Sequence, residues 1–237
     1  GVALLVSGIV AFLLMLLEGP NAGWLSLPII ALGALSFVLL SAFVWNEFRF
    51  AEPIIPPSLF RRPLFRAGTT HGFLVGMAMF GSISFIPLFA QGVVGLSATG
   101  AGIALAPAML GWTASSIIGG RLMLRVGHRA VIVFSTGVML LGAFLLSRVS
   151  ADTTQLQLII SSGLLGLGMG AGVTAFNISI QDEVERREMG AATSTNQFAR
   201  SIGGTVGVSI MGTLLSVRLT EGLAKIPELA ASGIEAR

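Results

Sequence analysis

Long apolar runs separated by short polar stretches dominate the chain. The longest of these runs, residues 67–120, contains no Asp, Glu, Lys or Arg. A membrane-spanning helix needs about 20 mostly apolar residues, so this run is long enough for two spans. Small and polar residues gather at 91–100, and they predict a turn between the two spans.

The same criterion predicts about seven spanning helices over the whole chain. Their expected ranges are 1–17, 25–44, 70–90, 99–119, 130–147, 156–177 and 191–217. The runs are continuous and rich in Leu, Ala, Gly and Met, whereas the strands of a membrane barrel would be short and alternating. The pattern therefore predicts an all-α integral membrane protein, a multi-pass helix bundle.

The loops between these helices alternate in charge. Arginines occupy every second connection, at Arg49, Arg61, Arg62 and Arg66, then at Arg121, Arg125 and Arg129, then at Arg186 and Arg187. The loops between these connections, which lie on the opposite side of the membrane, contain a single arginine, Arg148. Basic residues are enriched in cytoplasmic loops, so the arginine-rich connections are predicted to be cytoplasmic.

The chain divides at a proline-rich linker. Residues 47–66 carry Pro53, Pro56 and Pro57, which cannot continue a regular helix. We therefore expect two helices in 1–46, a cytoplasmic linker at 47–66, five helices in 67–217 and an extracytoplasmic tail at 218–237. The first run resembles a spanning helix cut near its start more than a signal peptide, so the chain is expected to be a fragment.

Composition excludes several classes of protein. Charged residues make up 11% of the chain and the mean hydropathy is +0.88, values that a soluble fold would not show. The net charge is +3, but the arginines are scattered and form no basic stripe, so no nucleic-acid partner is predicted. No phosphate-binding loop, zinc-protease motif or nucleophile elbow occurs, so we predict neither an enzyme nor a cofactor or metal.

The connection at residues 120–129 carries the most informative motif. It resembles the signature loop of the major facilitator superfamily, with Gly120, Arg125, Gly127 and Arg129 in register and Arg121 beside them. In that family the loop helps to latch the two halves of the transporter in one conformation. The family's Asp is replaced by Leu124 here, as is common in the second, C-terminal copy of the loop.

Several further stretches, taken in order, resemble one branch of that superfamily, the fourteen-helix drug:proton antiporters. These stretches are Gly23 with Trp24, and residues 52–53, 58–65, 85–91, 101–108 and 181–208. The resemblance implies a transporter bundle in which 1–46 is the central helix pair and the rest is most of the C-terminal half. It also implies a proton-coupled exporter of amphipathic or cationic drugs, with the lipid bilayer, a small substrate and protons as its partners.

The resemblance also suggests where a substrate cavity would lie. The candidate cavity residues are Phe80, Met109, Trp112, Met169, Asn196 and Gln197. For Asn196 and Gln197, hydrogen bonding between helices is the favoured alternative role. Arg200 lies about a third of the way into a predicted span, whereas His71 and His128 are expected at helix ends. No carboxylate lies inside a span, so a proton-coupling carboxylate would have to lie in the other half. A single lysine among many arginines, with abundant Ala and Gly, suggests a bacterial source. Together with the transporter resemblance, the expected location is the inner (plasma) membrane.

Two alternatives remain open at this point. A metabolite transporter of the same superfamily would use fixed polar groups in its cavity, and the mostly apolar spans lean against it. A non-transporting membrane remnant is the other, because substrate sites of this fold form between two halves.

Overall fold

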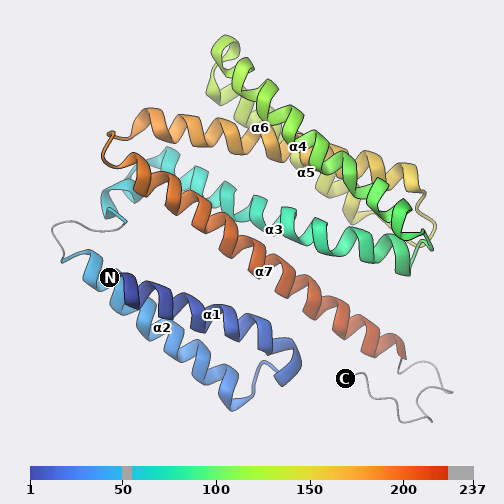
Figure 1. Ribbon diagram of the computed structural model, residues 1–237, viewed down its shortest axis with the longest axis horizontal. Helices are drawn as coiled ribbons and strands as arrows, with labels where there is room; N and C mark the ends of the chain where they lie inside the picture. The colour runs from blue at the N-terminus through green and yellow to red at the C-terminus, as the bar shows by residue number, and fades with distance from the viewer. Residues whose placement is uncertain (50–54, 224–237) are drawn as a thin grey trace. The chain divides into compact units, whose positions relative to one another are not determined.

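The computed structural model describes residues 1–49 and 55–223, which form seven long α-helices and one short 3₁₀ turn (Figure 1). In order they are α1 (Val2–Ala22), α2 (Leu27–Glu47), η1 (Pro57–Arg61), α3 (Pro63–Gly92), α4 (Ala98–Val126), α5 (His128–Ser147), α6 (Gln155–Glu183) and α7 (Met189–Leu223). All seven α-helices are long and apolar enough to cross a membrane. The predicted all-α membrane bundle is confirmed.

Several helices extend beyond the apolar windows that predicted them. The third span was expected to begin near residue 70, but α3 begins at Pro63, inside the expected linker. The α6 helix continues to Glu183, and α7 continues to Leu223, into the expected tail. Charge-free windows mark only the segment in hydrocarbon, whereas a helix keeps its backbone hydrogen bonds into the polar interface. The rest of the tail and residues 50–54 of the linker lie outside the described residues.

The chain forms two compact units. One unit is Ser58–Gly204, and the other joins Gly1–Pro57 to the part of α7 that begins at Thr205. In the first unit, α6 is the central helix. It contacts α3, α4 and α5, and 56% of its spanning window is buried, against 33% or less for every other span. Figure 1 shows α4 crossing α6 at an angle. Ser162 on α6 donates to the Ala104 carbonyl at 2.6 Å, and the hydroxyls of Ser116 and Thr174 lie 2.6 Å apart, so α4 and α6 are joined at two levels.

The second unit contains α1, α2 and the C-terminal part of α7. Ser36 on α2 donates to the Gly8 carbonyl at 2.9 Å, and Ser209 on α7 donates to the Leu16 carbonyl at 3.3 Å. The last turn of α2 is also fixed, because the buried Glu47 carboxylate accepts from the Ile55 N–H at 2.9 Å. The expected division kept residues 67–217 together, whereas contacts place the end of α7 with the first two helices.

Membrane orientation can be measured directly, because the chain has no native cysteine. We expect Ser58→Cys to react with an impermeant maleimide only from the cytoplasm, and Ala98→Cys and Ala151→Cys only from outside. All three positions are exposed, so labelling does not require local unfolding. Labelling of Ser58→Cys from outside would overturn the orientation derived from the arginines.

Candidate functional site

The α4–α5 connection contains the predicted latch loop, and one residue separates the two helices. α4 ends at Val126, Gly127 adopts a φ of +80°, and α5 begins at His128. The left-handed conformation explains the glycine at 127, because a residue with a Cβ pays a steric penalty there. A Cβ added to Gly120 would lie 3.7 Å from the Thr174 methyl, an ordinary contact, so that position does not require glycine for space.

The three arginines of this loop are exposed and form no ion pair or hydrogen bond within the part of the chain that the structure describes. Arg121 and Arg125 lie one turn apart on the last part of α4, and Arg129 lies in the first turn of α5. Leu124, at the position of the family's Asp, is 88% exposed. The loop therefore presents cations without an acidic partner of its own, and its role as a latch stays a prediction.

Another set of contacts joins the start of α3 to the α6–α7 connection, and the sequence analysis missed it. Arg62, at the N-cap of α3, pairs with Glu188 at 3.4 Å and also donates to the carbonyl of Glu183, the last residue of α6. Beneath it, Leu59 and Phe65 are fully buried in a cluster with Ile180, Val184 and Ala192. Arg62 was identified only as a linker arginine, because its partner follows it by more than a hundred residues.

The candidate cavity residues converge on Arg200 of α7. The Arg200 guanidinium carbon lies 6.0 Å from the centre of the Trp112 ring on α4, and the guanidinium donates to the Gln197 side chain. Met109 lies one turn before Trp112 on α4 and is 39% exposed. A cation over an indole ring is attracted to its π face, and the attraction grows as water is removed. Arg200 is thus held between α4 and its own helix.

Phe80 reaches the same region from α3. A Cβ at Gly204, one turn after Arg200, would lie 2.9 Å from the Phe80 ring carbon Cγ, so the ring covers the glycine. A Cβ at Gly76 would lie 2.8 Å from the Arg200 carbonyl carbon. Small residues on both helices bring α3 and α7 into backbone contact beside the patch. Met109, Trp112, Gln197, Arg200 and Phe80 therefore form a single continuous patch, called here the Arg200 patch.

Asn196 and Met169 lie behind this patch rather than on it. The Asn196 amide donates to Asn177 on α6 at 2.9 Å, and the side chain is 6% exposed against Gly72 of α3. Met169 is 1% exposed in a cluster with Val75, Met139 and Leu165, on which Trp112 packs. Asn196 thus ties α7 to α6, and Met169 supports the indole from behind. Asn177 was missed, although a carboxamide at the end of an apolar span was a usable signal.

His71 is also more buried than its sequence position suggested. It was expected at a helix end, yet it is 8% exposed, and its ring lies 4.6 Å from the Phe176 ring, centre to centre. Neither ring nitrogen has a hydrogen-bond partner among the described residues. The imidazole fills space between α3 and α6, because the ring closely approaches Gly172.

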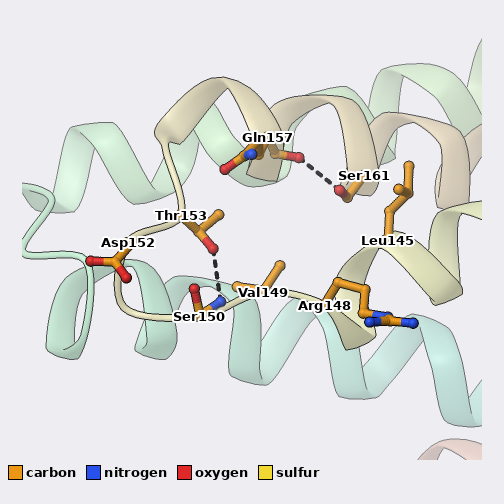
Figure 2. A pocket seen from close by; sticks show the side chains of 8 residues that line it. All are labelled: Leu145, Arg148, Val149, Ser150, Asp152, Thr153, Gln157 and Ser161. Carbon is orange, nitrogen blue, oxygen red and sulfur yellow. Dashed lines mark hydrogen bonds between the residues drawn. The ribbon is translucent and has the colours of Figure 1, made fainter.

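A small pocket of 320 Å³ lies at the α5–α6 connection, and its lining residues do not belong to the Arg200 patch (Figure 2). Its polar groups are used locally. The Thr153 hydroxyl accepts from the Ser150 N–H at 2.8 Å, and the Ser161 hydroxyl donates to the Gln157 carbonyl at 2.7 Å. Thr154 and Gln157 form a capping box at the start of α6. The pocket therefore reflects a capped turn and offers few free groups to a ligand.

Comparisons with known proteins agree with the fold. A family model described as Major Facilitator Superfamily matches residues 1–208. The multidrug transporter protein MdtP of Bacillus subtilis is 35% identical over 92% of this chain and 40% of its own length. Multidrug resistance protein 3 of the same organism is 35% identical over 90% of this chain and 42% of its own length.

A third relative comes from an actinomycete. The tetracycline resistance determinant of Streptomyces rimosus is 32% identical over 97% of this chain and 66% of its own length. The chain thus spans less than half the length of the two Bacillus relatives and about two thirds of the Streptomyces one.

Proposed function

Because the chain belongs to the major facilitator superfamily, whose members are transporters and not enzymes, we propose that it forms part of a secondary active exporter of amphipathic drugs. The Arg200 patch is the observation that supports this proposal. It combines two aromatic rings and a thioether with one cation and one carboxamide. Apolar side chains with a few polar groups among them are typical of the lining of sites for small amphipathic ligands.

The cargo in this proposal is amphipathic, and its charge preference follows from Arg200. Acidic residues of the described chain lie in loops or near helix ends, so none compensates Arg200 within the membrane. An unpaired cation favours neutral or anionic cargo. Export of cationic drugs would need a carboxylate from outside the described residues. The drug names of the relatives, multidrug and tetracycline, fit an amphipathic cargo.

Proton exchange is the proposed energy source, with its titratable carboxylate outside this chain. Movement would come from rocking of one helix bundle against the other, as the superfamily fold implies. The glycines that bring α3 and α7 into backbone contact would hold these two helices together as parts of one moving bundle. The loop of Gly120, Arg121, Arg125, Gly127 and Arg129 is proposed to latch one of the two conformations.

Efflux of a fluorescent lipophilic dye tests this function. Cells that express the complete reading frame are expected to expel a neutral dye, and a protonophore is expected to abolish the expulsion because it removes the proton gradient. Membrane insertion is checked in parallel by the cysteine labelling described above. Efflux that survives the protonophore would contradict proton coupling. An inserted protein that exports a polar metabolite but no dye would favour the metabolite-transporter alternative.

A further inference from the structure

An apolar groove of 540 Å³ opens between α4 and α5, with α6 as its floor. Leu122 and Val126 of α4 line it at one end, together with Ala130 of α5. Val138 and Leu164 line it further in. None of its lining residues comes from α3 or α7, within the chain the structure describes, so it is separate from the Arg200 patch. We call it the α4–α5 groove.

The groove has no free polar group along its walls. Its two hydroxyl side chains bond to carbonyls of their own helices, Ser115 to Trp112 at 3.2 Å and Ser135 to Ile132 at 3.0 Å. Its rim is apolar and open, since Phe134 is 71% and Ile118 61% exposed. An occupant of this surface must therefore be apolar itself.

The dimensions of the groove match one leaflet of a bilayer. Along α4 it extends from Val126 to Ser115, which at 1.5 Å per residue is about 16 Å. The hydrocarbon core of a bilayer is about 30 Å thick, so the groove covers roughly half of it. It begins beside the α4–α5 loop, on the side that the arginine distribution assigns to the cytoplasm.

Three cations stand at that end of the groove. Arg121, Arg125 and Arg129 each immediately precede a lining residue, and residues 120–130 contain no acidic side chain. All three are exposed and have no ionic partner within the described chain. Clusters of Arg at the cytoplasmic ends of helices attract anionic headgroups by about 1 kcal/mol each.

From this arrangement we propose that the α4–α5 groove binds an anionic phospholipid of the cytoplasmic leaflet. One acyl chain lies along Leu122, Phe134 and Val138, and the headgroup phosphate lies among Arg121, Arg125 and Arg129. The phosphate supplies the negative charge that the Leu124 position lacks. A second copy of this chain would bring the same three cations together, so charge complementarity favours the lipid.

Native mass spectrometry of the purified protein, equilibrated with a mixture of phosphatidylglycerol and phosphatidylcholine, tests the proposal. The unaltered protein is expected to retain phosphatidylglycerol preferentially. Changing Arg121, Arg125 and Arg129 together to Gln should lower that preference by at least about fivefold, the equivalent of one arginine–headgroup contact. The matched control changes Arg61, Arg66 and Arg186 to Gln, which removes the same charge from exposed positions away from the groove.

The acyl-chain part of the site has its own matched pair of variants. Val138→Trp fills the groove and should reduce retention of both lipids, whereas Val133→Trp, on the same helix but outside the groove, should not. Elution as a single monodisperse species shows that each variant is folded. Equal phosphatidylglycerol preference in the two arginine variants would overturn the proposal. Unchanged lipid retention in folded Val138→Trp would also overturn it. So would a dimer of the unaltered protein that Val138→Trp loses and Val133→Trp keeps, because the groove would then bind a second copy of the chain.

Discussion

Replacing Gly166 by alanine is expected to lower the free energy of unfolding of the helix bundle by about 3 kcal/mol. Gly166 lies on α6 where it crosses α4, and an added Cβ would lie 2.7 Å from both the carbonyl carbon and the Cα of Ala108. These are backbone atoms, so no side-chain rotation can relieve the clash, and the two helices must move apart. The α4–α6 contact holds the central helix, so the loss spreads beyond one residue.

Thermal unfolding in detergent measures this effect. A loss of about 3 kcal/mol corresponds to a fall in Tm of roughly 6–12 °C for a chain of this size. Gly102→Ala is the matched control, because Gly102 lies on α4 with nothing within 4 Å of its added Cβ. That control should keep or raise the Tm, since alanine is the better helix former by about 1 kcal/mol. Equal Tm values for the two variants would contradict the close packing at Gly166.

Replacing Arg200 by glutamine is expected to shift the cargo preference of the full-length transporter toward cations. At about 8 Å and an effective dielectric constant near 20, the repulsion between Arg200 and a cationic ligand is about 2 kcal/mol. Removing it should raise efflux of a cationic dye relative to a neutral dye by up to about 30-fold. Arg200→Lys keeps the charge and should keep the original preference, although it removes the guanidinium that lies near the Trp112 ring.

The control for this experiment is Arg148→Gln. Arg148 also lies over an aromatic ring, with its guanidinium carbon 5.0 Å from the centre of Phe144, but it sits at the α5–α6 loop. Its removal changes the net charge equally and should leave the cargo preference unchanged. If both variants shift the preference alike, net charge and not the Arg200 patch controls selectivity. If neither does, Arg200 does not face the cargo.

Single side chains show where the sequence was sufficient for the site and where it was not. Gln197 and Arg200 were singled out by their polar character inside an apolar span, and Trp112 by the family resemblance of its helix. Their convergence depends on how α4 packs against α7, which no local pattern encodes. Met169 illustrates the difference, because the same apolar residue suits a cavity wall or a core, and only packing places it in the core.

The sequence by itself determined that this protein is a bundle of seven membrane-spanning helices with arginine-rich connections. That outcome is local, because every backbone group in hydrocarbon needs an internal hydrogen bond and each helix needs about 20 apolar residues. The tertiary structure decided which helix is central, that Arg62 pairs with Glu188, and that α4 and α5 leave a groove between them. These features arise from contacts between residues distant in sequence, whose free energies depend on how the helices pack in three dimensions.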